Sequence, residues 1–192
     1  MKLVLGIGNP GGSYEGTRHN VGYRVLDALA SREGGRWRRD ERLRSEVCDL
    51  ERARLIKPLT YVNRSGEAAA AALESGPADR ILVVCDDVYL QAGRLRLRPS
   101  GSDGGHNGLK SLIEKLGTKD FARLRVGVGA PESGTDLAEH VLGPFRPEEE
   151  AAIAQALGIA TEVCGAWIER GFLPARELLS RLLSNPKKEQ DE

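Results

Sequence analysis

The first 22 residues, MKLVLGIGNPGGSYEGTRHNVG, constrain the fold more than any other stretch of this chain. The apolar run Leu3–Ile7 predicts a buried strand, and the glycines and proline of residues 6–12 predict a loop after it. This loop carries Asn9 and leads to His19, which directly precedes a helical apolar pattern from Val21 to Arg32. Open α/β folds place their chemistry on loops at the carboxyl ends of buried strands. Because histidine transfers protons near neutral pH, we expect this loop to border an active site.

Length and composition describe one globular domain. The chain has 192 residues, of which 40% are hydrophobic and 29% are charged. We expect a domain at residues 1–184 and a polar, disordered tail at residues 185–192. Lys and Arg total 28, as do Asp and Glu, so the formal net charge is zero. A nucleic-acid partner would therefore bind a local basic patch, because the protein as a whole is not basic.

The cysteines and the apolar runs indicate a cytoplasmic protein. Cys48, Cys85 and Cys164 are odd in number and widely spaced, which is typical of buried thiols in a reducing compartment. We expect no signal peptide, and we expect the apolar runs to be too short to cross a membrane. The predicted location is the cytoplasm, without membrane association.

Strand and helix patterns alternate along the chain, which predicts an α/β fold. Glu46–Leu50 and Ala53–Pro58 are expected to pair as two strands around a turn. The continuous apolar run Ile81–Cys85 predicts a central strand covered on both faces. This run ends at two carboxylates, Asp86 and Asp87, so a second buried strand stops at ionisable groups.

The last third of the chain is predicted to be mostly helical. Pro147–Gly171 has helical periodicity, and we expect it to be interrupted near Gly158 and Gly165 because glycine disfavours helix interiors. A final helix is expected at Pro174–Leu183.

Three basic stretches are candidates for contact with an anionic partner. We interpret residues 32–44 as a solvated loop rather than as an arm that faces phosphate. Arg94–Arg98 alternates strictly with leucine, so its three arginines share one face of a predicted strand. Residues 123–129 alternate in the same way and place Arg123 and Arg125 on one face.

Three familiar kinds of site fit this sequence poorly. Residues 6–11 match the G-x-G-x-x-G pattern of dinucleotide-binding folds, but a long loop and a basic, strandless region follow them. No G-x-S-x-G pentapeptide offers a serine nucleophile, and Cys85 is more simply a core residue. The histidines, which are His19, His106 and His140, lack paired spacing and local ligand partners. We therefore expect neither a cofactor nor a metal.

A histidine paired with a carboxylate remains as the candidate chemistry. In such a pair the histidine activates water, while the acid fixes its tautomer and stabilises the imidazolium. His19 and Asp86 are the candidates, because Asp86 stands at the carboxyl end of a strand, as Asn9 does. Asn9, Asn63 and Asn107 are expected on loops beside strand or helix ends. Their amides are neutral donors that can hold a carbonyl, position water or stabilise an oxyanion.

Five segments together resemble the bacterial peptidyl-tRNA hydrolase family over nearly the full length of the chain. They are GIGNPG with TRHNVG, KPLTYVNRSG, ILVVCDD, GGHNGLKSLIEKLG and FARLRVGVG, in that order. The resemblance implies a single α/β domain with a mixed, twisted sheet flanked by helices. It also implies hydrolysis of the ester that joins a peptide to the 3′-terminal ribose of tRNA. We expect this enzyme to be a monomer that needs no cofactor.

The resemblance also implies roles for individual residues. His19 resembles the family's catalytic base, and Asp86 resembles its carboxylate partner. Asn9 and Asn63 resemble asparagines that position substrate and water, and Asn107 resembles the one that holds the peptide backbone or the bound water.

Three further residues are assigned to substrate binding by the same resemblance. Tyr14 matches the family's tyrosine in the loop before the histidine. Arg98 and Arg125 fall where the family clamps a tRNA phosphate with basic side chains.

The chain departs from the family at positions that concern substrate contacts. Val62 stands where the family usually has methionine, which shortens one wall of the peptide cleft. Arg98 corresponds to a lysine, Tyr89 to a position that is often acidic, and Asp103 to a small or neutral residue. Two other classes of protein compete with the enzyme, namely a non-catalytic RNA-binding relative and a dinucleotide-dependent enzyme. The set of His19, Asp86 and three asparagines favours the enzyme, because binding alone requires no such set.

Overall fold

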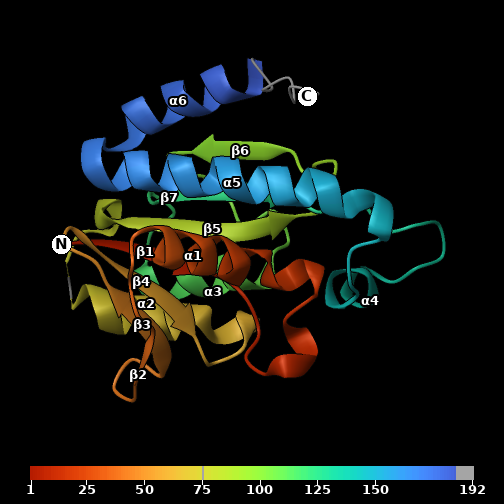
Figure 1. Ribbon diagram of the computed structural model, residues 1–192. Coiled ribbons are helices and arrows are strands. Elements are labelled where there is room, and N and C mark those ends of the chain that lie inside the picture. Colours follow the sequence, from red (N-terminus) through yellow and green to blue (C-terminus); the bar gives the residue numbers. More distant parts are fainter. Residues whose placement is uncertain (75, 185–192) are drawn as a thin grey trace.

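The computed structural model describes residues 1–74 and 76–184, and in this part of the chain a seven-stranded sheet forms the centre of the fold (Figure 1). The strands lie in the order β2-β3-β4-β1-β5-β7-β6. The four strands from β4 to β7 in this order are parallel, whereas β2, β3 and β6 run antiparallel to their neighbours. The strands are β1 (Lys2–Gly6), β2 (Arg38–Asp40), β3 (Ser45–Asp49), β4 (Ala53–Pro58), β5 (Ile81–Asp87), β6 (Leu95–Arg98) and β7 (Ala122–Gly127).

Helices cover both faces of the sheet, so the predicted fold class, an α/β domain with a mixed sheet flanked by helices, is confirmed. The helices are α1 (Val21–Arg32), α2 (Ser65–Leu73), α3 (Asn107–Leu116), α4 (Leu137–Leu142), α5 (Pro147–Arg170) and α6 (Phe172–Ser184). The tail that we predicted at residues 185–192 lies outside the described residues.

Alternate residues of each central strand enter two separate cores. On one face, Val4 and Val84 pack with residues of α1, α5 and α6. On the other face, Leu5 and Val83 pack with residues of α2 and α3. This arrangement explains the continuous apolar run Ile81–Cys85, because a parallel strand covered on both faces has no solvent side.

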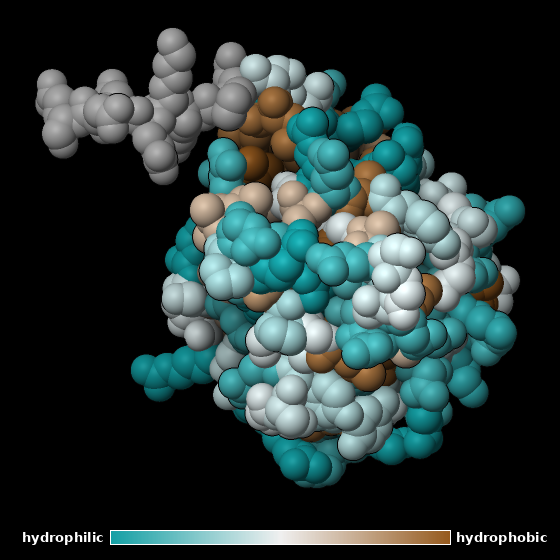
Figure 2. Space-filling model, turned by 90° about the vertical axis from the view of Figure 1, so that its right-hand side faces the viewer, coloured by the Kyte–Doolittle hydropathy of each residue, from teal (hydrophilic) through white to brown (hydrophobic). Residues whose placement is uncertain are grey.

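The adjacent strands β1 and β4 are followed by helices that pack on opposite faces of the sheet. The chain continues from β1 into α1 on one face and from β4 into α2 on the other, which opens a crevice at the carboxyl ends of these strands. Figure 2 looks onto this edge of the sheet, where brown apolar residues alternate with teal polar ones.

Two glycines bring the neighbouring helices close enough to complete the crevice. A Cβ on Gly22 would lie 2.5 Å from the backbone oxygen of Val84, so only glycine lets the start of α1 approach β5. A Cβ on Gly66 would lie 2.2 Å from the backbone oxygen of Ser111, so α2 and α3 touch backbone to backbone. These contacts place the residues just before α1 and α2 beside the ends of the strands.

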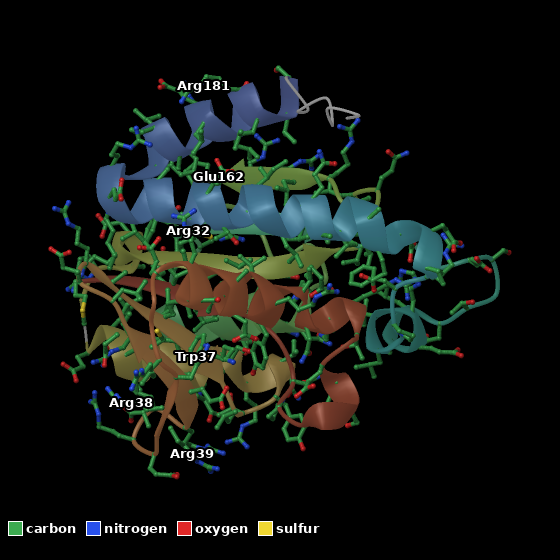
Figure 3. The ribbon with its side chains drawn as sticks, in the orientation of Figure 1. Arg32, Trp37, Arg38, Arg39, Glu162 and Arg181 are labelled. Carbon is green, nitrogen blue, oxygen red and sulfur yellow. The ribbon has the colours of Figure 1, made fainter. Side chains whose placement is uncertain are left out.

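The basic stretch at residues 32–44 differs from the predicted loop, because it contains the short edge strand β2. Three residues of mostly charged sequence carry no apolar alternation, so the sequence pattern does not indicate a strand there. Its arginines are neutralised by acidic neighbours, as in the pairs Arg38–Asp49 at 2.7 Å and Arg39–Glu41 at 2.7 Å. Figure 3 labels Arg38 and Arg39 on this edge strand.

Helix α5 is continuous, so the predicted interruptions near Gly158 and Gly165 are wrong. At Gly165 a Cβ would lie 2.5 Å from a guanidinium nitrogen of Arg32, so this glycine makes room for a side chain of α1 and does not end the helix. Figure 3 shows Arg32 at this boundary between α1 and α5.

The length of α5 also corrects the expectation about membrane-spanning segments. By length and composition this helix is long and apolar enough to cross a membrane, with a mean hydropathy of 1.4 over 18 residues. Alanines and scattered isoleucines raise this mean without forming a long uninterrupted run of large apolar residues. In the fold 56% of that window is buried, as expected for a core helix packed against the sheet.

The cysteines are buried and unpaired, as predicted. Cys85 lies on β5 and Cys164 on α5, and burial raises the pKa of the Cys164 thiol to about 12. Burial likewise raises the pKa of Cys85, which is not suited to act as a nucleophile at neutral pH.

Candidate active site

A cleft of about 800 Å³ opens at the carboxyl ends of the parallel strands. Its lining includes polar side chains from several loops, namely Asn9, His19, Asn63, Asp86, His106 and Asn107. The size of the cleft and its mixture of apolar walls with a few convergent polar groups are typical of a substrate site.

His19 and Asp86 face each other in this cleft. His19 lies in the 3₁₀ turn Arg18–Asn20 directly before α1, and Asp86 lies near the end of β5. His19 Nδ1 is 2.8 Å from Asp86 Oδ1. The carboxylate is only 3% exposed, so solvent hardly screens this contact.

A second histidine, His106, contacts the same carboxylate oxygen. Its Nε2 is 2.9 Å from Asp86 Oδ1, and its Nδ1 accepts hydrogen bonds from the backbone N–H groups of Gly108 and Leu109 at the start of α3. A ring nitrogen that accepts hydrogen bonds from two N–H groups carries no proton. In the neutral ring the proton is therefore on Nε2, which donates a hydrogen bond to Asp86. His106 is thereby held in one tautomer and one orientation.

The two histidines keep Asp86 ionised. Burial alone would raise the pKa of this carboxyl group, but the N–H groups of His106 and His19 outweigh burial and lower the pKa well below its ordinary value. A carboxylate is acceptor-only, so His19 must donate from Nδ1. Among the described residues no hydrogen-bond partner engages His19 Nε2, and its lone pair is available to the cleft.

The sequence suggested that the histidines have no ligand partners nearby, but the structure brings His19, His106 and Asp86 together. Ligand atoms of His19, Asp86 and His106 lie within 4.8 Å of one another, although the sequence shows no ligand spacing. The hydrogen bonds of His106 argue against a metal here, because its Nε2 carries a proton while its Nδ1 caps α3. To ligate an ion through Nε2, this ring would have to give up the cap or become an imidazolate.

Asn9 joins the first loop to the segment after β4. Its Oδ1 accepts a hydrogen bond from Val62 N at 3.0 Å. Asn20 holds the same loop from the other side, because its Oδ1 accepts from Asn9 N at 2.8 Å and its Nδ2 donates to Asn9 O at 2.9 Å. The side-chain oxygen of Asn9 is thus used by the fold, and within the described residues its Nδ2 has no partner. Asn63 and Asn107, both exposed, line the same cleft.

Tyr61 and Val62 form part of the cleft wall, and Tyr14 lies behind them. Tyr61 has a φ of 63°, which is an uncommon and costly conformation for a bulky side chain, and its ring is 53% exposed. Tyr14 packs edge-on against Tyr61, with ring centroids 6.4 Å apart. Tyr14 therefore supports the wall and does not itself line the cleft.

The two arginines assigned to phosphate lie at different places. Arg125 lines the cleft and pairs with Asp87, its Nη1 lying 3.3 Å from Asp87 Oδ2. Arg98 is exposed on the edge strand β6, outside the cleft lining. The register pairs Arg98 with Arg123 and Arg96 with Arg125, so all four point to the same face of the sheet.

Sequence reasoning missed three parts of this site. His106 and Asn20 lie next to predicted residues, but only long-range contacts reveal what they bind. The third part is α4, whose Leu137, Val141 and Leu142 form an apolar wall of the cleft. A helix of six residues gives too little periodicity to stand out in a sequence.

Buried Arg18 attaches this wall to the segment that carries His19. Its Nη1 donates to the backbone oxygen of Pro144, and its Nη2 is 2.9 Å from Oε2 of Glu149 at the start of α5. The backbone N–H of Arg18 also donates to Gly143 O at 3.0 Å. One residue thus connects the histidine turn with the segment that follows α4.

The fold is an α/β domain with a cleft at the carboxyl ends of its parallel strands, and this cleft holds a histidine–aspartate pair together with amide donors, a combination typical of hydrolases. The family model described as peptidyl-tRNA hydrolase matches residues 3–190. The peptidyl-tRNA hydrolase of Halalkalibacterium halodurans is 46% identical over 178 residues, which cover 90% of this chain and 96% of the relative. That of Symbiobacterium thermophilum is 47% identical over 182 residues, with 91% and 96% coverage.

Solved structures agree with the sequence comparisons. The crystal structure of peptidyl-tRNA hydrolase from Acinetobacter baumannii superposes with a TM-score of 0.87 at 30% identity, covering 93% of this chain and 94% of that one. The chain belongs to the peptidyl-tRNA hydrolase family, and it is an enzyme of the hydrolase class.

Proposed function

We propose that the protein hydrolyses the ester between a peptide and the 3′-terminal ribose of tRNA, with His19 as the general base. The observation that carries this proposal is the buried Asp86 carboxylate, which accepts from His19 Nδ1 at 2.8 Å and leaves Nε2 directed to substrate. Nε2 takes a proton from water while the water oxygen attacks the ester carbonyl. The tetrahedral intermediate then expels the ribose oxygen, which receives the proton from the imidazolium.

Asp86 serves this reaction through His19 and does not touch substrate itself. As an ionised group it stabilises the imidazolium that forms when water loses its proton. His106 donates a hydrogen bond to Asp86, which holds this carboxylate in place and favours its ionised form. The cap that His106 forms on α3 fixes the orientation of the His106 ring. His106 is therefore a positioning residue in this mechanism.

The asparagines supply donors that carry no charge of their own. Asn9 lines the cleft and its Nδ2 has no partner among the described residues, while Asn63 and Asn107 are exposed on the cleft walls. We assign Asn9 and Asn63 to the ester carbonyl and the attacking water, and Asn107 to the peptide backbone. Neutral donors that face a developing oxyanion stabilise the transition state more than the ground state.

In the bound substrate, the acyl part and the tRNA part extend from the ester in opposite directions. The strand order places Asn63 after β4 on one side of the histidine–aspartate pair and Arg125 on β7 on the other. The peptide lies along Val62 and the apolar wall of α4. The tRNA phosphates lie toward Arg125 and Arg98, because this face of β6 and β7 concentrates positive charge in a chain with no net charge. We further propose that the protein acts in the cytoplasm, as a monomer.

Release of free tRNA from an N-acetylated aminoacyl-tRNA tests the proposed function. Wild-type protein is expected to release tRNA, and Asp86→Asn is expected to reduce turnover with little change in KM. Asparagine retains a hydrogen-bond acceptor for His19, but it does not stabilise the imidazolium to the same degree. Binding of the substrate without any release would overturn the proposal and favour a non-catalytic RNA-binding protein.

A further inference from the structure

Tyr89 has the highest exposed fraction of the large hydrophobic side chains in the described part of the chain. It lies just after β5, its side chain is part of the cleft lining, and it is 77% exposed. An aromatic ring offers a large area for contact, so leaving it in water forgoes a favourable burial.

The backbone that carries Tyr89 is held by hydrogen bonds, although the residue is highly exposed. Tyr89 N donates to Asp87 Oδ1 at 2.9 Å, and the backbone oxygen of Asp87 accepts from Val128 N at 3.1 Å. The next residue, Leu90, accepts from Gly129 N at 2.9 Å. The turn is thus held to the end of β7, which presents the ring from a defined position at low cost in backbone entropy.

Arginine side chains lie on the β7 side of the cleft, which is the side on which Tyr89 follows β5. Asp87 contacts both residues: its Oδ1 accepts from the backbone N of Tyr89, and its Oδ2 pairs with the guanidinium of Arg125. On the same face of the sheet Arg96 and Arg98 are exposed, and no carboxylate of the described residues pairs with either of them. Exposed rings beside a cationic track are the combination that binds single-stranded nucleic acid, through stacking and phosphate contacts.

The position of Tyr89 relative to the reacting groups indicates that this residue faces the nucleotide part of the substrate and not the peptide. Across the edge of the sheet the order is β4, β1, β5 and β7, so Asn63 and Tyr89 lie on opposite sides of the first loop with Asn9. The ring shares the side of Arg125, where phosphate is expected. The apolar wall of α4 and Val62 is available to the peptide.

We propose that Tyr89 is a stacking site for an unpaired base at the 3′ end of the tRNA. The proposal rests on the proposed function, because it needs the ester to lie at His19. Stacking of one base on an aromatic side chain is sequence-tolerant and depends little on salt, unlike the phosphate contacts of the arginines.

Two short substrates separate the base from the rest of the tRNA. Both are single-stranded oligonucleotides with the same N-acetylated aminoacyl ester and the same phosphates, but one lacks the bases of its last three nucleotides. The variants are Tyr89→Leu, which keeps apolar volume without a ring, and Tyr89→Phe, which keeps the ring. Leu173→Ala on α6, another exposed apolar position, is the control.

With the substrate that carries bases, Tyr89→Leu is expected to raise KM about tenfold, within the range measured for stacking of a base on an aromatic residue. Tyr89→Phe and the control are expected to match wild type. With the abasic substrate, all four proteins are expected to be equal. The dependence of KM on salt should be unchanged in Tyr89→Leu, because no phosphate contact is lost.

Other outcomes overturn the proposal. Equal losses with both substrates would place Tyr89 against the acyl group or in the fold, and no loss with either would leave it without a role in binding. Failure of wild-type protein to hydrolyse both substrates is a separate result, because it would contradict the proposed function and not the stacking site alone.

Discussion

His19 Nδ1 lies 2.8 Å from Asp86 Oδ1, although the two residues are 67 positions apart in sequence. The geometry leaves one ring nitrogen bound to an ionised carboxylate and the other, in the cleft, without a partner in the described part of the chain. This relationship is the basis of the predictions about catalysis, because it determines which atom can accept a proton from water.

Replacing His19 with alanine should lower kcat/KM by about 10²–10⁴-fold, the usual contribution of a general base. The side chain lies in a short turn and belongs to neither apolar core, so the protein should still fold. Steady-state hydrolysis of N-acetyl-aminoacyl-tRNA, with a circular-dichroism melt of the same sample, checks both points. His140→Gln, which changes a histidine outside the cleft, is the matched control. Wild-type turnover by folded His19→Ala protein would exclude this residue as the base.

His106→Asn should separate the two functions of His106. Asparagine is a good N-cap, so the melting temperature should change little, but its side chain is too short to reach Asp86. Without that N–H, the Asp86 carboxylate is free to stabilise the protonated form of His19 more strongly. The acid limb of the kcat/KM profile should therefore move to higher pH, with a fall in activity smaller than that of His19→Ala. An unchanged pH profile would show that His106 only caps α3.

Removal of divalent ions should not alter the rate. Three ligand atoms lie close together, but His106 Nε2 carries a proton while Nδ1 caps α3. Assays after dialysis against a chelator, and after addition of Zn²⁺, Mn²⁺ or Mg²⁺ in turn, measure the effect. Strong inhibition by the chelator that one of these ions reverses would contradict the mechanism.

Arg98→Ala should raise KM for full-length peptidyl-tRNA and flatten its salt dependence. Each lost phosphate contact lowers the slope of log K against log salt by about 0.7–0.9. Arg125→Ala should act similarly, although it also removes the partner of Asp87. Arg39→Ala, on the β2 hairpin, is the control and should have no effect. A minimal ester of a single nucleoside should be nearly insensitive to both changes. Equal damage with this minimal substrate would place the two arginines in the catalytic centre or in the fold.

Glu149→Gln should destabilise the protein at pH 7 and much less near pH 3. Burial alone would raise the pKa of Glu149, but the backbone N–H of Arg146 and the charge of Arg18 lower it below its ordinary 4.5. A lowered pKa in the folded state stabilises the protein above pH 4.5, and this contribution disappears as pH falls through the folded-state pKa. We expect a loss of about 2 kcal/mol at pH 7, as for a hydrogen bond to a charged group.

Denaturant unfolding of wild type and Glu149→Gln at several pH values measures this difference. Glu148→Gln is the matched control, because Glu148 is in the same turn of α5 with a side chain that is 67% exposed. A difference between Glu149→Gln and wild type that stays constant down to pH 3 would show that ionisation of Glu149 is not its source.

Much of the fold was predictable because its central elements have strong local signals. The apolar run before Asp86 predicted a strand buried on both faces, and the periodicity after His19 predicted α1 with its observed bounds. The elements that the sequence did not indicate correctly are short or ambiguous. The strand β2 has three charged or polar residues, and α5 contains glycines that make room for packing, as Gly165 does for Arg32.

The sequence by itself determined the chemistry that is available, a lone histidine after the first strand, an aspartate at the end of a buried strand and asparagines on loops. Only the tertiary structure decided how these groups combine. In the folded protein His106 is a second hydrogen-bond partner of Asp86, and the side-chain oxygen of Asn9 accepts a hydrogen bond from the backbone N of Val62. It also separated Arg98 from the cleft that contains Arg125. The physical reason is that hydrogen bonds between loops depend on strand order and on close helix packing. Both are set by contacts across the whole chain and leave no periodicity in the local sequence.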